Sequence, residues 1–326
     1  MKTNMCMGLK KTKSFVDNFI VVIILLSFSI VFTFSIQESA EAVNNNTDIL
    51  VLYAGSLVKI FENDLKPIFE NLTNYNLKGE GKGSLQISNL IADGFRRPDV
   101  FISADTLPIK NLMNNNPPLT DWFIRFASAE FVIAYNEQSL FAPDFLKVKE
   151  GKTQWYNILD KDGFKFGRSD PNLDPKGYYT IIIAELSNIY YNDSTIKERI
   201  LGDDNNRKQI FPEEVLSSVL EIGQVDAIAA YKHEALAKKL PYITLPNKIN
   251  LGDPNITNYY NKINYKLKSG QTIYGNPIYF SVTIPHTVKN LEGANDFIKF
   301  LFSSKGKDIL KQVGLNPIIP FLQRDG

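Results

Sequence analysis

The sequence predicts an α/β fold, in which short strands alternate with helices. Short apolar runs recur along the chain, and several of them end in turns rich in glycine and serine. Several of these turns lead into segments whose apolar residues recur at helical spacing. This repeated succession of strand, tight turn and helix is typical of domains built on a parallel sheet.

Length and charge narrow the possible functions. The chain has 326 residues, which favours two domains because single cores stop growing at roughly 250–300 residues. Residues 1–42 contain four basic and three acidic residues, so the rest of the chain holds 32 of each sign and is neutral. Because a neutral body has no basic field, we expect no nucleic-acid partner. An anionic ligand would have to be held by local hydrogen-bond donors.

Cysteine and histidine are scarce. Cys6 is the single cysteine, and the two histidines are His233 and His286. This composition excludes a disulfide framework and a thiol nucleophile in the body of the chain, and it argues against a zinc or haem site. We therefore expect no cofactor, and we expect both histidines to be surface or capping residues.

Residues 1–42 have the pattern of a secretory signal peptide or an N-terminal anchor. Three lysines precede an apolar run at residues 19–36, and Ser39-Ala40-Glu41-Ala42 provides a small-x-small site. The run is long enough to span a bilayer, so a retained anchor is the alternative to cleavage after Ala42. Either outcome places the body outside the cytoplasm. Residues 43–47 form a short polar linker.

The remaining elements follow in order along the body. Apolar runs predict strands at residues 49–53, 77–80, 99–103, 131–135, 164–167, 227–231 and 279–284. Helical spacing of apolar residues predicts helices at residues 57–72, 85–93, 180–191, 292–302 and 305–312. Gly314 is a stop signal for the last helix.

Three polar turns between strand and helix are the candidate functional segments. The first places Ser56 before a helix, and the second, at residues 79–84, places Ser84 before another. Free N–H groups at a helix N-terminus favour anions, although each serine could equally be a simple N-cap. The third turn, at residues 167–178, contains two Asp-Pro pairs and is either a rigid surface loop or part of a site.

Enzyme motifs are weak. The chain lacks a Gly-x-Ser-x-Gly elbow and a plausible Ser/His/Asp set. Ser56 and Lys59 match the Ser-x-x-Lys pattern of β-lactamases, but the companion motifs are missing, so we interpret the match as coincidence.

Taken together, these segments resemble the periplasmic molybdate/tungstate-binding proteins of ABC importers, in particular their archaeal-type branch. The most specific stretch is Gly-Arg-Ser-Asp-Pro-Asn-Leu-Asp-Pro at residues 167–175. The other matching segments, which run in order over nearly the whole body, are residues 53–57, 83–85, 98–105, 126–135, 177–178, 223–232, 245–251, 282–285 and 314–320.

The resemblance implies a two-lobe periplasmic-binding-protein fold of type II, the Venus-flytrap fold. Lobe 1 would comprise residues 48–134 plus 279–326, and lobe 2 residues 135–278. The chain would cross between lobes near residues 132–135 and 274–281. An anion would be trapped between the lobes.

The resemblance also implies a set of ligand-binding residues. Hydroxyls of Ser56, Ser84 and Tyr231 and the backbone N–H of Lys176 would donate to the anion's oxygens. Such a donor set can hold a dianion through neutral donors and helix dipoles, and it would reject protonated phosphate because it has no acceptor.

Asp174 matches a carboxylate that contacts the metal of the oxyanion directly in this branch. The branch has a second carboxylate just before the tyrosine, where this chain has Ala230. Glu234, one helical turn away, is a poor substitute, so we expect either four or five ligands around the metal instead of six, or a shifted anion preference.

The resemblance implies an ABC permease and ATPase as partners and a monomer that meets the membrane only through its N-terminal segment. Three alternatives remain open. The same fold could bind sulfate or ferric iron. Tyr178 and Tyr231 would be the candidate ligands of the iron. The chain could be an extracellular hydrolase or a surface adhesion protein.

Overall fold

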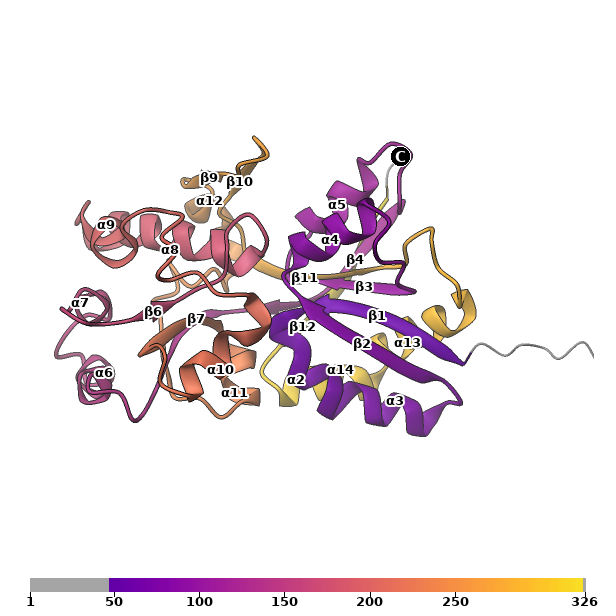
Figure 1. The fold of residues 1–326 in the computed structure, drawn as a ribbon, viewed down its shortest axis with the longest axis horizontal. Coiled ribbons are helices and arrows are strands. Elements are labelled where there is room, and N and C mark those ends of the chain that lie inside the picture. Colours follow the sequence, from indigo (N-terminus) through magenta and orange to yellow (C-terminus); the bar gives the residue numbers. More distant parts are fainter. Residues whose placement is uncertain (1–46, 325–326) are drawn as a thin grey trace, which may run out of the picture. The chain divides into compact units, whose positions relative to one another are not determined.

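The computed structural model describes residues 47–324, so the predicted signal or anchor and most of the linker lie outside the described residues. From Thr47 onward the chain forms one compact unit, which contains two main sheets (Figure 1). We call the six-stranded sheet with its helices lobe 1, and the four-stranded sheet with its helices lobe 2.

The sheet of lobe 1 has the strand order β12-β4-β11-β3-β1-β2. Its strands are β1 (Asp48–Ala54), β2 (Asn76–Lys82), β3 (Val100–Ser103), β4 (Trp122–Ala129), β11 (Ile278–Thr283) and β12 (Asn316–Arg324). β1 pairs in parallel with β2 and β3, whereas β11 runs antiparallel to β3 and β4. The sheet is therefore mixed, and its parallel part leaves the turns after β1, β2 and β3 at one edge.

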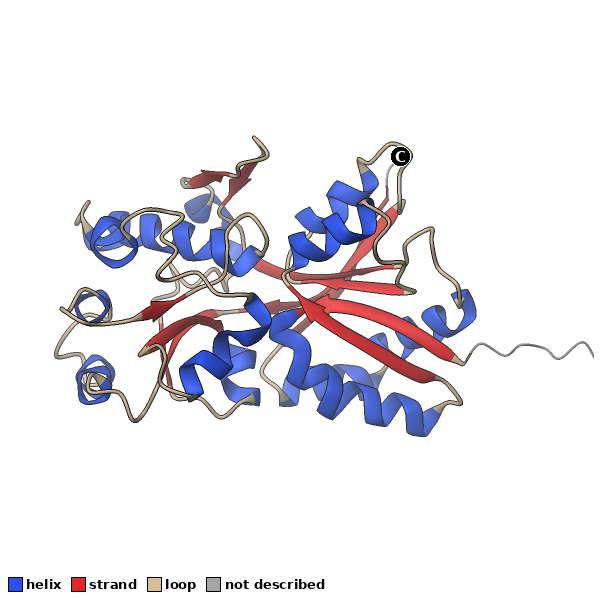
Figure 2. Cartoon of the chain, viewed as in Figure 1, coloured by secondary structure: helices blue, strands red, loops and turns tan. Residues whose placement is uncertain are grey.

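Helices cover both faces of this sheet (Figure 2). They are η1 (Gly55–Leu57), α2 (Val58–Ile60), η2 (Phe61–Leu65), α3 (Lys66–Leu72), α4 (Ser84–Ala92), α5 (Leu107–Met113), α13 (Leu291–Phe302) and α14 (Ser304–Gln312). The first four are continuous and confirm the helix predicted at residues 57–72, with one π turn at η2. Phe61, Phe69 and Phe297 pack together on one face of the sheet, and Leu52, Ile87 and Phe101 belong to a separate core cluster.

The sheet of lobe 2 has the order β6-β7-β5-β8. Its strands are β5 (Phe131–Tyr135), β6 (Phe166–Gly167), β7 (Ala227–Tyr231) and β8 (Tyr242–Thr244), and a hairpin of β9 (Asn264–Lys266) and β10 (Thr272–Tyr274) stands apart. The helices are α6 (Ala142–Lys149), α7 (Tyr156–Leu159), α8 (Pro175–Tyr191), α9 (Ile196–Leu201), η3 (Glu213–Val215), α10 (Leu216–Glu221), α11 (Lys232–Ala237), η4 (Pro254–Ile256) and α12 (Thr257–Tyr260).

The chain crosses between the sheets at two places. β4 and β5 flank Glu130 and belong to different sheets, and β11 returns to the first sheet after β10. Residues 131–134, which the predicted boundary assigned to lobe 1, therefore pair in the sheet of lobe 2. A strand pattern marks residues 131–135 as a strand, but it does not say which sheet the strand joins.

Two other predictions need correction. Helix α8 begins at Pro175, five residues before the predicted start, because Asp174 caps the helix and Pro175 fits its first position. His233 is fully buried and stacks on Tyr231 with ring centroids 5.6 Å apart, whereas a surface or capping position was predicted. Burial lowers the pKa of His233 to about 3, so its ring is neutral. His286 is exposed, as predicted, and hydrogen-bonds to Asp121.

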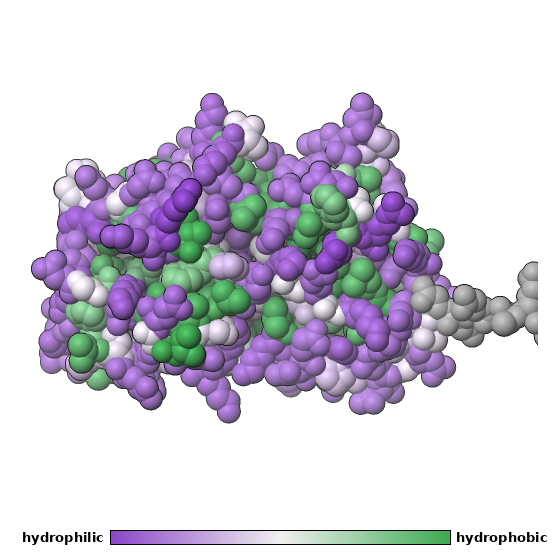
Figure 3. Space-filling view, in the orientation of Figure 1, coloured by the Kyte–Doolittle hydropathy of each residue, from purple (hydrophilic) through white to green (hydrophobic). Residues whose placement is uncertain are grey.

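The outer surface is mostly polar. Figure 3 shows hydrophilic groups over most of one face, with apolar groups gathered in the region of α10. Val215 and Ile222, which flank α10, are exposed. Within residues 47–324 no helix is both long and apolar enough to cross a bilayer.

The buried carboxylate of Asp99 accepts hydrogen bonds from three backbone N–H groups. It accepts from Leu50 at 2.8 Å, from Lys289 at 2.7 Å and from Asn290 at 2.9 Å. Asp99→Ala should lower the free energy of unfolding by about 3 kcal/mol or more, because three buried donors lose their acceptor. Denaturant unfolding measures the loss. Asp93→Ala, at an exposed position, is the control and should change stability by less than about 0.5 kcal/mol.

Candidate ligand-binding site

The polar turns of lobe 1 meet lobe 2 directly. The backbone N–H of Gln86, in the first turn of α4, donates to Leu173 O at 3.0 Å. A Cβ at Gly83 would lie 2.5 Å from Leu173 O, and one at Gly55 would lie 1.6 Å from Glu213 Oε2. Glycine is required at both positions because the other lobe occupies the space of a side chain. The two lobes are therefore closed on each other at the predicted turns.

Both predicted serines are buried at this contact. Ser56 is 3% exposed, and its hydroxyl has no hydrogen-bond partner within residues 47–324. Ser84 begins α4, and its hydroxyl accepts from the backbone N–H of Ala104 at 3.1 Å. The N-cap positions belong to Ala54 and Gly83, so neither serine is an N-cap. The capping alternative fails, and the Ser56 hydroxyl in particular has no partner among the described residues.

Asp174 caps α8 from lobe 2 and lies against lobe 1. Its Oδ1 accepts from the Ser169 hydroxyl at 2.7 Å and from the Lys176 backbone N–H at 3.0 Å. Burial raises the pKa of Asp174, against the opposing effects of the Lys176 ammonium, the Ser169 hydroxyl and the backbone N–H groups of Lys176 and Ser84. The Lys176 N–H, predicted as a ligand donor, is thus engaged in the helix cap.

The Lys176 side chain is completely buried in a cluster of carboxylates. Its Nζ donates to Glu213 Oε1 at 2.8 Å and to Glu234 Oε2 at 2.7 Å. It also lies 5.2 Å from the centroid of the Tyr231 ring. Although burial alone would lower the pKa of Lys176, the surrounding carboxylates raise it, so the ammonium stays charged. The cluster formed by Asp174, Lys176, Glu213 and Glu234 is called the carboxylate cluster below.

Tyr231 ends β7 beside this cluster. Its hydroxyl is buried and has no partner in the part of the chain that the structure describes. Burial and the nearby Asp174 carboxylate raise the pKa of Tyr231 well above its ordinary value, so the group is a neutral hydroxyl. Ser56 and Tyr231 therefore offer unused hydroxyls from opposite lobes.

Position 230 carries an apolar side chain that is buried in lobe 2. Ala230 packs in an apolar cluster with Val132 and Leu216, whereas the next residue, Tyr231, belongs to the other core cluster. Successive side chains of a strand point to opposite faces, which explains the separation. The carboxylate of Glu234, on the following helix, pairs with the Lys176 ammonium.

Sequence reasoning missed Glu213 and assigned no role to the arginine in the third turn. Arg168 is fully buried, and its guanidinium donates to the carbonyls of Asp203 and Asp204 and to Gln209 Oε1. These bonds fix the segment that leads into η3 and so position Glu213. An acidic residue in a first helical turn is ordinary, so the sequence gives no signal that Glu213 is buried.

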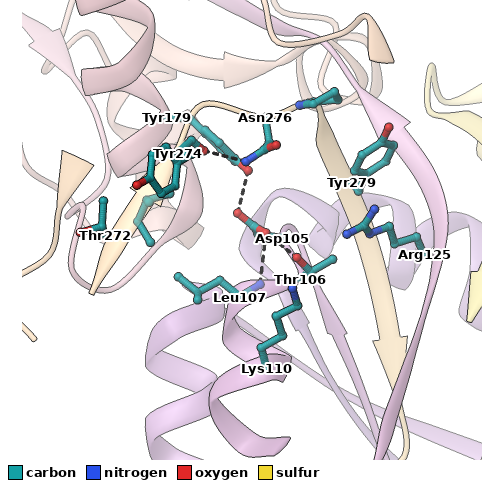
Figure 4. A pocket seen from close by; sticks show the side chains of 12 residues that line it. Asp105, Thr106, Leu107, Lys110, Arg125, Tyr179, Thr272, Tyr274, Asn276 and Tyr279 are labelled. Carbon is teal, nitrogen blue, oxygen red and sulfur yellow. Dashed lines mark hydrogen bonds between the residues drawn. The ribbon is translucent and has the colours of Figure 1, made fainter. Parts of the chain in front are cut away.

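A second contact joins the lobes next to the site. Asp105 of lobe 1 accepts from the Tyr178 hydroxyl at 2.6 Å and from the Tyr179 hydroxyl at 2.7 Å, both on α8 of lobe 2. Figure 4 shows Asp105 and Tyr179 at the wall of a cavity of about 300 Å³, which Lys110 and Arg125 also line. Since the Tyr178 hydroxyl is engaged here, it is not a free iron ligand. We call this contact the aspartate clasp.

The aspartate clasp should hold the lobes closed. Replacing both tyrosines, Tyr178→Phe with Tyr179→Phe, should favour the open arrangement by about 3 kcal/mol or more, because two bonds to a charged acceptor are lost. Small-angle X-ray scattering should then report a larger radius of gyration. Tyr53→Phe is the matched control, because it removes a hydroxyl bond to Glu62 within lobe 1. Equal scattering from all three proteins would contradict a role in closure.

Comparison with known proteins identifies the family. The family model for bacterial extracellular solute-binding proteins matches residues 49–316. A molybdate/tungstate-binding protein, WtpA, of Thermococcus kodakarensis is 32% identical over 328 residues, which cover 92% of this chain and 91% of that protein. An uncharacterized solute-binding protein of Petrotoga mobilis is 33% identical over 296 residues, which cover 89% of each chain.

Solved structures share the fold. The periplasmic molybdate-binding protein of Azotobacter vinelandii superposes with a TM-score of 0.59 at 16% identity and covers 84% of this chain and 100% of its own. The sulfate-binding protein SubI of Mycobacterium tuberculosis gives a TM-score of 0.57 at 15% identity, covering 83% and 87%. These likenesses confirm the predicted two-lobe fold. The chain belongs to the family of bacterial extracellular solute-binding proteins, and it is an extracytoplasmic binding protein and not an enzyme.

Proposed function

We propose that this protein captures molybdate or tungstate outside the cytoplasm and delivers it to the permease and ATPase subunits of an ABC importer. One observation carries the proposal. The hydroxyls of Ser56 and Tyr231, from opposite lobes, are buried at the closed interface with no partner among the described residues. Buried hydroxyls seldom stay unpaired, so this pair supports a ligand with oxygen acceptors at the interface.

The relatives support the choice of cargo. The names of the Thermococcus kodakarensis protein and of a Pyrococcus abyssi protein, which is 33% identical and aligns over 83% of this chain, both specify molybdate and tungstate. No basic side chain is required for such a ligand, because neutral donors and the N-terminus of α4 can stabilise a dianion in a dry site. Ser84, at the first position of α4, would complete the donor set.

Asp174 has a distinct role in the proposal. An ionised carboxylate repels an oxyanion unless it bonds the metal centre directly. Asp174 lies at the lobe contact, with its Cβ 3.1 Å from the position of a Cβ at Gly83. We therefore propose that it contacts the molybdenum or tungsten of the cargo. The protein would act as a monomer that meets the membrane only through its N-terminal segment.

Ser56→Ala should separate ligand binding from folding. Because the hydroxyl has no partner in residues 47–324, its loss should leave the free energy of unfolding nearly unchanged. Loss of a hydrogen bond to a charged ligand should weaken molybdate binding by about 10- to 100-fold. Ser88→Ala is the matched control, because its buried hydroxyl donates to Pro108 O at 2.7 Å within lobe 1. That variant should lose stability and keep its affinity.

Calorimetric titration tests the choice of cargo. Residues 43–326 should bind molybdate and tungstate with sub-micromolar Kd, and the double variant Ser56→Ala with Ser84→Ala should abolish the binding. Sulfate and phosphate are titrated in parallel. Tight binding of sulfate in place of molybdate would keep the transport role and change the cargo. Absence of heat with every oxyanion would refute the cargo and direct attention to ferric iron or an organic ligand.

A further inference from the structure

The cavity beside the aspartate clasp is built by both lobes. Lobe 1 contributes Asp105, Lys110 and Arg125, and lobe 2 contributes Tyr179 and the hairpin strand β10. None of the residues proposed above to hold the oxyanion lines it. Its volume of about 300 Å³ is at the lower end of the range for small-molecule pockets, and it is roughly ten times the share of one water molecule in the liquid. The cavity is therefore large enough for an organic molecule.

The hairpin of lobe 2 closes one side of the cavity against lobe 1. Gln271, directly before β10, donates from its side-chain amide to Asn111 Oδ1 of α5 at 3.2 Å. Figure 4 shows Thr272 and Tyr274 of β10 on one side of the cavity and Arg125 on the other. Thr272 and Tyr274 are exposed, so this side also offers a route to solvent. The lobes thus meet around the cavity at the clasp and at the hairpin.

Two cations of the lining have no charged partner. The Lys110 ammonium and the Arg125 guanidinium form no ion pair and no hydrogen bond within residues 47–324, and Arg125 Nε is in addition buried. Figure 4 shows both side chains turned toward Asp105 and Thr106. Unused donors of like charge that face one space attract an anion.

Asp105 is the one acidic residue of the lining, and both of its oxygens are engaged. Oδ2 accepts from the two tyrosine hydroxyls of the clasp, and Oδ1 accepts from the Thr106 hydroxyl at 3.2 Å and the Leu107 N–H at 3.1 Å. These four neutral donors occupy the carboxylate, so the cations are left without it. Two positive charges against one negative charge leave a net charge of +1 in the lining, which suits a monoanion.

Aromatic rings make up much of the remaining wall. The Arg125 guanidinium lies 5.0 Å from the ring centroid of Tyr279 and 5.2 Å from that of Phe321. These rings hold the guanidinium in place, so its planar fork of N–H donors is preorganised for a carboxylate. Tyr179 and Ile273 also line the cavity. An aromatic or apolar body would be buried against them.

We propose that this cavity binds a small aromatic carboxylate between the lobes and thereby favours the closed arrangement. Arg125 and Lys110 would hold the carboxylate, and the ring would lie among the tyrosines. Because the lining comes from both lobes, such a ligand has its full set of contacts only when the lobes are closed. By linkage it should tighten the binding of any other ligand that requires closure. The binding step is independent of the proposed cargo, and only the coupling to molybdate rests on the proposed function.

Calorimetric titration of the purified full chain with sodium benzoate, at about pH 8, tests the site. Benzamide is the neutral counterpart, and phenyl phosphate is the dianionic one. Benzoate should bind, and the other two should bind at least about tenfold more weakly, because the amide lacks the charge and the second phosphate charge meets Asp105. Absence of benzoate binding, or equal binding of benzamide, would overturn the proposal. Tighter binding of phenyl phosphate would overturn the assignment to carboxylates.

Two variants locate the carboxylate. Lys110→Gln removes a charge that has no internal partner, so the protein should keep its stability and bind benzoate about tenfold more weakly. Arg125→Lys keeps the charge but loses the fork, and it should weaken benzoate binding by about as much. Lys78→Gln is the matched control, because Lys78 is exposed in β2, the edge strand of the same sheet, and does not line the cavity.

The Lys78→Gln protein should keep the benzoate affinity of the original chain. Equal affinity in all four proteins would contradict the placement of the carboxylate. Thermal unfolding shows which variants are folded, and Lys110→Gln decides the question even if Arg125→Lys does not fold.

Titration of molybdate in saturating benzoate tests the coupling. The Kd for molybdate should fall by about fivefold or more, and Lys110→Gln should reduce the effect. An unchanged Kd would overturn the effect on closure. A higher Kd would show that benzoate enters the oxyanion site, which would overturn the proposal. If neither molybdate nor tungstate binds at all, the proposed function fails, while benzoate binding and its weakening in Lys110→Gln still decide the cavity.

Discussion

The buried ammonium of Lys176 is the constraint on which the ligand site depends. Moving a charge out of water is costly, and the ammonium is tolerated because two carboxylates and an aromatic ring surround it. Those partners come from η3, α11 and β7, so this one residue of α8 holds three further elements of lobe 2 in register. Loss of either carboxylate would remove one of the two charged acceptors of the ammonium. The position of the Tyr231 hydroxyl follows from this arrangement.

The supports of the site extend outward from that centre. Arg168 fixes the segment before η3 through backbone carbonyls, and Asp174 caps α8 two residues before Lys176. Both residues belong to the third polar turn. This turn therefore supports the site by fixing the backbone of the segment before η3 and the start of α8. Asp105 then connects α8 to the loop after β3. Movement of α8 is therefore coupled to lobe closure.

Local patterns in the sequence predicted local structure well. They did not predict which residues far apart in the sequence pair with each other. The strands β5 and β7 and the helix from Gly55 to Leu72 follow from apolar spacing, and the serines follow from glycine-rich turns. Glu213 and Glu234 lie 37 and 58 residues from Lys176, and no spacing rule links them. His233 was placed wrongly for the same reason, because its burial comes from packing against Phe280 and Tyr231.

Selectivity in such a site must come from hydrogen-bond geometry and from the exclusion of water, because the one buried ammonium of the carboxylate cluster is already paired. The Lys176 ammonium is paired twice and offers little attraction to an arriving anion. Neutral hydroxyls and the α4 N-terminus are weak donors in water, yet they become effective once the lobes exclude solvent. Affinity should therefore depend on closure as strongly as on the ligand contacts. The aspartate clasp joins the lobes through Asp105 and two hydroxyls of α8 and supplies part of that closure.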